Sequence, residues 1–135
     1  MKNCFKKLLV LMVLLVSIVA FVGCKYESFE EISVEVEYDN QRIYFKENIK
    51  SEEKVVFKLL EKLCLEDEDF TFEAKDSEYG KYIISICGIS EKTENSKLYY
   101  WSFYVNGNYA SKGISSQKLS NGMSIKFVYE SFNLN

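Results

Sequence analysis

The sequence predicts an α+β fold, in which a mixed sheet of about five strands carries one amphipathic helix on one face. Three observations lead to this prediction. Several short segments alternate apolar and polar residues, which is the period of a strand with one solvated face. Residues 51–65 instead carry apolar residues at helical spacing. The dipeptides Asn106-Gly107 and Asn121-Gly122 favour turns between the later strand segments.

A hairpin is expected at the start of the domain. Apolar side chains alternate with polar ones over residues 32–38, and the alternation resumes at Ile43 and Phe45. Between them, residues 39–41 (Asp-Asn-Gln) are typical of a turn.

The helix is predicted over residues 51–65. Ser51 precedes Glu52 and Glu53, so a hydroxyl can cap the free amides while carboxylates lie near the positive end of the helix dipole. The apolar stripe consists of Val55, Val56, Leu59, Leu60, Leu63 and Cys64. The acidic run 66–69 would be repelled by the negative end of the dipole, and we therefore expect the helix to end near Leu65.

Further strands are expected after the helix. Their residue ranges are 70–72, 81–87, 98–105, 109–114 and 124–130, with polar loops over 76–80 and 90–97. Segment 81–87 is dense in apolar residues and predicts a central strand. A hairpin, one helix and then several strands is the order that a β-grasp fold requires.

The N-terminal residues 1–23 have the features of an export signal. Lys2, Lys6 and Lys7 are followed by the apolar segment 8–22, which is shorter than the roughly 20 residues that span a bilayer. The sequence Phe21-Val22-Gly23-Cys24 resembles the lipobox of bacterial lipoproteins, in which the cysteine thiol receives a diacylglycerol, although Phe21 replaces the usual leucine. A plain secretory signal before a free cysteine is the alternative.

The predicted organisation is a lipoprotein signal peptide (1–23), a lipidated N-terminus and spacer (24–30) and one β-grasp domain (31–135). Lipidation of Cys24 would anchor the chain to the cell membrane on its extracellular face. The absence of proline and histidine, with abundant Lys, Glu, Asn and Ile, indicates an AT-rich genome and a Gram-positive host.

Charge argues against nucleic acid as a partner. Loss of Lys2, Lys6 and Lys7 with the signal leaves 14 basic and 20 acidic residues, a net charge of −6, and such a domain repels phosphate backbones. Of the four cysteines, Cys64 and Cys87 would remain in the domain without a lipid. They form either a disulfide, which export permits, or two buried thiols.

The sequence carries no signature of catalysis, and we predict neither an enzyme nor a cofactor. It contains no histidine for general-base chemistry, no nucleophile elbow and no glycine-rich phosphate loop. The acidic run 66–69, with Asp76 and Glu78, offers oxygen atoms for calcium, but its spacing matches no calcium loop, and no metal site is predicted.

The block 99–104 is the most unusual local feature because five of its six residues are aromatic. In a strand, Trp101 and Phe103 share one face and Tyr100 and Tyr104 the other. A single helix covers only one face, so tyrosines on the opposite face are candidates for ligand binding. The predicted ligand-binding residues are Tyr100, Tyr104, Asn106 and Tyr109. The alternative is cross-strand packing, with Trp101 in the core and Asn106 in a turn.

Four motifs in the second half of the chain resemble one family. They are GKYIISICG (80–88), YWSFYVNG (100–107), SKG (111–113) and LSNGMSI (119–125). They are similar to the transcobalamin-like C-terminal domain, a bacterial extracellular module related to the small β domain of animal vitamin B12 carriers. The resemblance implies a β-grasp fold. In the animal carriers the module closes over cobalamin together with a helical domain, so the resemblance implies cobalamin as one ligand, whereas the absence of histidine removes the usual protein ligand of cobalt.

Together these observations predict a membrane-anchored binding module without enzymatic activity, whose ligand is a small molecule such as a cobamide or a glycan. The alternative is an interaction protein that binds another surface protein or the cell wall through its sheet face or edge. A concave, tyrosine-lined patch would favour the first hypothesis, and a long uncovered edge strand the second.

Overall fold

The computed structural model describes residues 2–4, 6–7, 23 and 25–134. Residues 25–134 contain two β-sheets and the helix α2 (Val56–Glu66), and residues 2–4 and 6–7 are also helical. Cys24 and residues 8–22, on which the lipidation and signal-peptide predictions depend, lie outside the described residues. Across the part of the chain that is described, no helix has the length and hydropathy needed to cross a bilayer.

The larger sheet joins the two ends of the domain. Its strands are β1 (Phe29–Tyr38), β2 (Gln41–Ser51), β6 (Lys92–Glu94), β7 (Lys97–Val105), β8 (Asn108–Tyr109) and β9 (Ser124–Asn133). Their order is β2-β1-β9-β7-β6, and β8 pairs with β7. Strands β1 and β9 are parallel, whereas the other pairs are antiparallel. Strand β1 begins two residues before the predicted domain boundary at residue 31.

Each predicted hairpin turn contains two successive residues in the left-handed backbone conformation. Asp39 and Asn40, between β1 and β2, have φ angles of 52° and 57°. Asn106 and Gly107, between β7 and β8, have φ angles of 49° and 81°. Two successive residues of positive φ are the hallmark of the type I′ turn, whose twist matches that of the flanking strands. The turns predicted at both places are confirmed.

The predicted start of the helix is wrong. Ser51 is the last residue of β2 and is almost fully buried, and its hydroxyl accepts a hydrogen bond from the Glu53 amide at 3.1 Å. No side chain caps α2. Backbone carbonyls of a distant segment instead accept hydrogen bonds from the first amides of the helix. Val56 N–H donates to the Gln117 carbonyl and Phe57 N–H to the Ile114 carbonyl, both at 2.9 Å. The helix ends at Glu66, close to the expected position.

A second sheet was not predicted. It contains β3 (Phe72–Ser77), β4 (Gly80–Ile86) and β5 (Ile89–Ser90), in that order. Segment 81–87 is therefore central in this small sheet rather than in a single sheet of about five strands. The predicted loop 90–97 contains β6, and the strand predicted over 109–114 is reduced to the short β8. After Tyr109 the chain leaves the sheet, and Ile114 enters the core.

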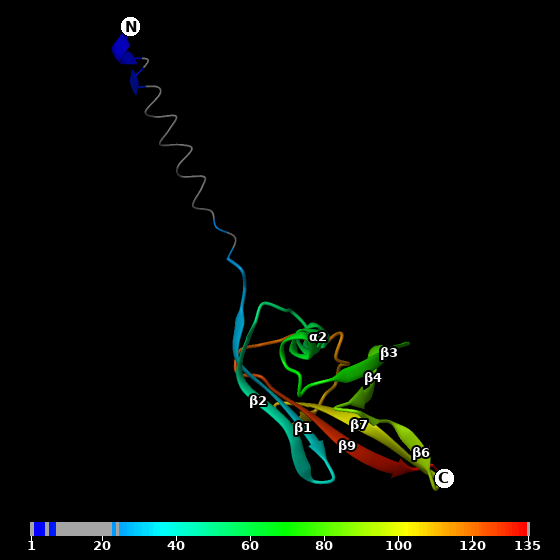
Figure 1. Ribbon diagram of the computed structural model, residues 1–135. Coiled ribbons are helices and arrows are strands. Elements are labelled where there is room, and N and C mark those ends of the chain that lie inside the picture. Colours follow the sequence, from blue (N-terminus) through cyan, green and yellow to red (C-terminus); the bar gives the residue numbers. More distant parts are fainter. Residues whose placement is uncertain (1, 5, 8–22, 24, 135) are drawn as a thin grey trace.

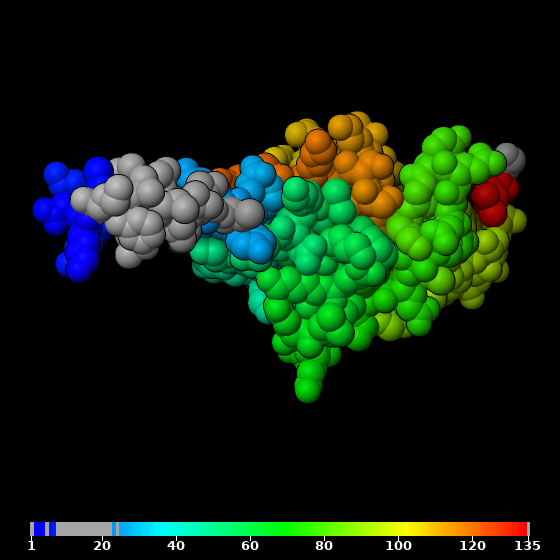
Figure 2. Space-filling view, turned by 90° about the horizontal axis from the view of Figure 1, so that it is seen from above, coloured from blue at the N-terminus to red at the C-terminus, as the bar shows by residue number. Residues whose placement is uncertain are grey.

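Helix α2 and the small sheet lie on the same side of the large sheet (Figure 1). The apolar residues Val56, Leu59, Leu60 and Leu63 of α2 are buried, as the predicted stripe requires. The segment between β8 and β9 runs beside α2 (Figure 2) and pairs with its start through the Val55–Lys118 bridge. These elements enclose one core, whose buried apolar residues in the described chain all lie between Ile32 and Phe127. The molecule is strand-rich and of the α+β class.

Candidate functional site: an aromatic groove between the two sheets

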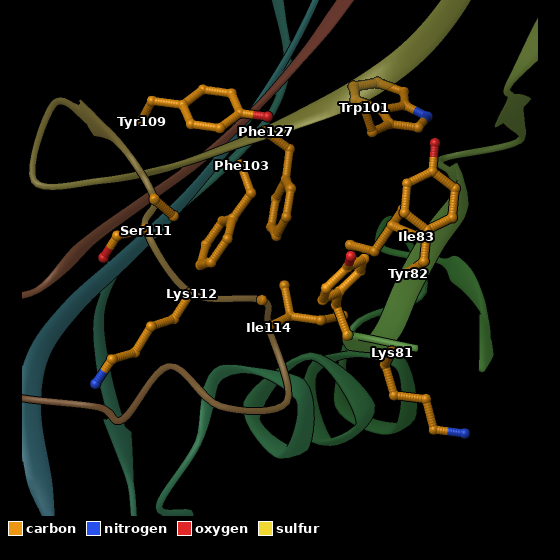
Figure 3. A pocket seen from close by; sticks show the side chains of 13 residues that line it. Lys81, Tyr82, Ile83, Trp101, Phe103, Tyr109, Ser111, Lys112, Ile114 and Phe127 are labelled. Carbon is orange, nitrogen blue, oxygen red and sulfur yellow. The ribbon is translucent and has the colours of Figure 1, made fainter. Parts of the chain in front are cut away.

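A groove of about 440 Å³ has the character of a binding site. It lies between β4 of the small sheet, β7 and β9 of the large sheet, and residues 109–114. Figure 3 shows Phe103 and Phe127 in the middle of the groove, with β4 on one side and the segment after β8 on the other. We refer to this feature as the inter-sheet groove.

Aromatic rings from the large sheet form the floor of the groove. Phe103 of β7 and Phe127 of β9 are opposite each other in the strand register, and their rings stack with centroids 5.2 Å apart. Trp101 is only 5% exposed, and its indole N–H donates to the Ile89 carbonyl at 2.8 Å. Because this bond links β7 to the small sheet, it fixes both the indole ring and the separation of the two sheets.

The first wall is the strand β4. Tyr82 and Ile83 line it, and Lys81 lies at its edge, where it pairs with Asp76 at 2.7 Å. Burial, and secondarily the neighbouring Glu91 carboxylate, raise the pKa of Tyr82 to about 12. The Tyr82 phenol therefore stays protonated at neutral pH.

The second wall is the segment that follows β8. Tyr109 is 64% exposed, and Ser111 and Lys112 are also exposed to solvent (Figure 3). Within the described chain Lys112 forms no ion pair, so its ammonium group is available to a ligand. The groove thus combines flat apolar rings with hydroxyl and ammonium groups at its rim. Such a surface can stack on a planar or ring-shaped molecule and orient its polar substituents.

The structure separates the four residues predicted to bind ligand. Tyr109 lines the inter-sheet groove, and its ring packs edge-on against that of Tyr104 at 5.5 Å. Tyr104 lies outside the groove and donates its hydroxyl hydrogen to Glu130 at 2.8 Å. Tyr100 packs edge-on against Phe132, and the Asn106 side-chain oxygen accepts a hydrogen bond from the Ser124 amide at 2.9 Å. Trp101 lies in the core and Asn106 in a turn, as the packing alternative stated. A ligand role for these four residues stays a prediction.

Sequence reasoning missed the floor and the first wall of the groove. Tyr82 and Phe103 belong to different sheets, and no local pattern indicates that these sheets face each other. The one available signal was the SKG motif, because Ser111, Lys112 and Gly113 all line the groove.

The two cysteines of the domain are free thiols. Burial raises the pKa of both Cys64 and Cys87 above the ordinary value, so both stay protonated at neutral pH. This arrangement matches the alternative of two packed thiols. No group of three or more histidine, cysteine or acidic residues with metal-binding geometry occurs among the described residues.

The fold and groove describe an α+β domain with one aromatic site between its sheets. The chain belongs to the family DUF4430, a domain of unknown function, which matches residues 53–131. No curated protein matches the chain.

Several solved structures have a similar fold, among them the following two. A candidate metal-binding protein from Ruminococcus gnavus ATCC 29149 superimposes with a TM-score of 0.63 at 16% identity, over 76% of this chain and 98% of its own. Haptocorrin in complex with Cbi superimposes with a TM-score of 0.68 at 19% identity, over 82% of this chain. This chain corresponds to only 27% of the haptocorrin chain.

Proposed function

We propose that this protein is a non-enzymatic module, anchored by lipid on the extracellular face of the membrane, that binds a small molecule in the inter-sheet groove. The observation that carries the proposal is the lining of the groove. Rings of Tyr82, Phe103 and Tyr109 face a common space, and none of the lining residues is a carboxylate, imidazole or thiol. The groove therefore offers surfaces for stacking and hydrogen bonding, without the imidazole or carboxylate that most often acts as a general acid or base.

The topology supports a finer assignment to the β-grasp fold and to the transcobalamin-like family. In the order β2-β1-β9-β7, the parallel neighbours are β1 and β9, the first and last strands of the chain, and α2 follows the first hairpin. The likeness to haptocorrin, which was solved with Cbi, supports a corrinoid as the first ligand to test. A groove of about 440 Å³ would hold one edge of such a molecule, so we expect weaker binding than in a site that encloses its ligand.

The test is a titration of residues 25–135 with cobinamide and cobalamin, followed by equilibrium dialysis and by the fluorescence of Trp101, the only tryptophan. Saturable binding is expected, and Tyr109→Ala should weaken it about tenfold because an exposed aromatic ring of the wall is lost. Tyr26→Ala is the matched control, since Tyr26 is 80% exposed and does not line the groove. Equal affinities of wild type and Tyr109→Ala would contradict the proposed site, and no binding at all would remove corrinoids as the ligand.

One observation favours the alternative of a surface interaction protein. Strand β2 is 11 residues long and lies at the edge of the large sheet, with Ile43 and Phe45 exposed at 40% and 42%. Such an edge is a template for strand addition by a partner. Photo-crosslinking on intact cells from position 43, with position 118 as the control, tests it. A partner captured only from position 43, and lost in Phe45→Lys, would support this alternative over the groove.

A further inference from the structure

The inner face of the large sheet extends beyond the region that α2 and the small sheet cover. In this extension four neighbouring strands each contribute one side chain to a row across the sheet. The row consists of Tyr38 of β1, Tyr129 of β9, Tyr99 of β7 and Lys92 of β6. These residues, with Asp39, Glu130 and Ser131, line a hollow of about 320 Å³, which we call the tyrosine row site. It shares no lining residue with the inter-sheet groove.

The rings of this site are held in fixed positions. Tyr129 donates its hydroxyl hydrogen to the Ser90 carbonyl at 2.6 Å and packs against Trp101 at 5.0 Å. Tyr38 lies 5.4 Å from Tyr129, and Tyr99 stacks on Tyr129 at 6.1 Å with an interplanar angle of 20°. Because backbone pairing and a hydrogen bond set this arrangement, little side-chain freedom would be lost when a ligand binds.

The polar groups of the site lie at its rim. Lys92 Nζ lies 5.2 Å above the Tyr99 ring and pairs with Glu94 at 2.8 Å. Asp39 and Ser131 line the remaining rim, whereas the Glu130 carboxylate is hydrogen-bonded by the Tyr104 and Ser102 hydroxyls on the opposite face of the sheet. Tyr38 stays 40% exposed, so its ring is accessible from solvent.

We propose that the tyrosine row site binds a glycan of β-linked pyranose rings. Such sugars have flat C–H faces, which stack on tyrosine rings, and equatorial hydroxyl groups, which hydrogen-bond to carboxylates, hydroxyls and ammonium groups at a rim. The centroid separations of 5.4 and 6.1 Å reflect the spacing of adjacent strands. This spacing is close to the length of one pyranose unit in an extended β-1,4-linked chain, so successive sugars would meet successive rings. A purely apolar partner would leave the polar side chains of Asp39 and Ser131 at the rim without hydrogen bonds from the ligand.

Glycan binding at the tyrosine row site would be independent of small-molecule binding in the inter-sheet groove and would be a second function of the protein. The test is isothermal titration calorimetry of the full chain in detergent micelles, with chitotetraose and cellotetraose as β-1,4-linked probes and maltotetraose as the α-linked comparison. We expect saturable binding of at least one β-linked probe and a weaker response to maltotetraose. Tyr99→Ala and Tyr38→Ala should each reduce affinity about tenfold.

Two controls separate this site from the rest of the molecule. Tyr104→Ala changes a tyrosine of the same strand on the opposite face, and Tyr109→Ala changes the groove, so both should keep glycan affinity within about twofold of wild type. If Tyr99→Ala does not fold, as judged by circular dichroism, the exposed Tyr38→Ala variant decides the result. Absence of heat with both β-linked probes would overturn the proposal, and so would unchanged affinity in the variants of the row. Corrinoid binding is measured separately and has no bearing on this outcome.

Discussion

Gly80 brings β4 into close contact with the segment that forms the other wall of the groove. Its φ angle is +98°, and a Cβ atom at this position would overlap the Ser115 hydroxyl, which itself accepts a hydrogen bond from the Lys81 amide at 3.0 Å. Gly107 also has a positive φ, +81°, but open space surrounds the position of its missing Cβ atom. Gly107 is therefore required only for its backbone conformation, whereas Gly80 is required both for its conformation and for the lack of a side chain beside Ser115.

We predict that Gly107→Ala lowers the free energy of unfolding by about 1–2 kcal/mol, the cost of a left-handed conformation in a residue with a side chain. Gly80→Ala should cost about 1 kcal/mol more, because it also displaces the Ser115 hydroxyl. Urea unfolding measures both values. When Ser115→Ala is already present, Gly80→Ala should lower the free energy of unfolding by less than it does in wild type. Equal costs of the two glycine substitutions would contradict the close contact.

Asp67, just beyond the end of α2, makes the stability of the fold depend on pH. Its carboxylate accepts hydrogen bonds from Lys46 Nζ at 3.1 Å and from the Tyr44 hydroxyl at 2.9 Å, and these bonds tie α2 to β2. The hydrogen bond from Lys46, followed by those from Tyr44 and the Asp69 amide, lowers the pKa of Asp67 below its ordinary value of 3.8. Since the folded pKa is the lower one, the stabilisation is present above pH 3.8 and is lost as the pH falls through the folded value.

The stability of the wild type should accordingly fall more steeply than that of Asp67→Asn as the pH is lowered from 5 to below 3.8. Urea unfolding at a series of pH values measures this difference. Parallel profiles for the two proteins would mean that Asp67 does not contribute to the acid sensitivity.

Only some of the residues that line the inter-sheet groove could be predicted from the sequence. Tyr109 was predicted to bind ligand, as one of the tyrosines on the sheet face that a single helix leaves uncovered, and it lines the groove. Tyr82 of the first wall and Phe103 of the floor were missed, since the groove exists only where two sheets meet. Alternation along a strand predicts which side chains share a face, but it does not predict what that face opposes.

At the scale of elements, α2 offers the sharpest contrast between buried and exposed leucines. Leu60 is fully buried in the core, whereas Leu65 on the same helix is 88% exposed. Leu60→Ala should lower the free energy of unfolding by about 2–5 kcal/mol, because it leaves a cavity in the core. Leu65→Ala should change it by less than about 0.5 kcal/mol. Denaturant unfolding of the pair checks both values, and a small effect at Leu60 would mean that α2 does not pack as described.

The elements differ in how well the sequence predicts them. The first hairpin, α2 and the strands β4, β7 and β9 carry strong periodicity or clear turn dipeptides, and all were predicted. The strands β5 and β6 are two and three residues long, and the exposed residues of β6 follow no apolar pattern. The start of α2 was misplaced because backbone carbonyls of a distant segment, rather than Ser51, satisfy its first amides. Pairing of this kind arises only in the tertiary structure.

At the scale of the whole molecule, the proposed location depends on Cys24. We predict that Cys24→Ser abolishes incorporation of labelled palmitate and releases the protein to the medium or leaves it unprocessed. Cys4→Ser is the matched control, because Cys4 belongs to the predicted signal peptide and would be removed with it. Metabolic labelling of cells that produce each variant, followed by fractionation, measures the effect. Labelling that persists in Cys24→Ser would contradict lipidation at this residue.

The central claim is that the inter-sheet groove binds a small molecule. Heteronuclear NMR of the ¹⁵N-labelled segment 25–135, titrated with cobinamide, tests this claim most directly. We predict amide shift changes concentrated in residues 79–83 and 109–114 and at the Trp101 indole N–H. Shift changes that centre on Tyr100 and Tyr104, or a spectrum that does not change at saturating cobinamide, would contradict it.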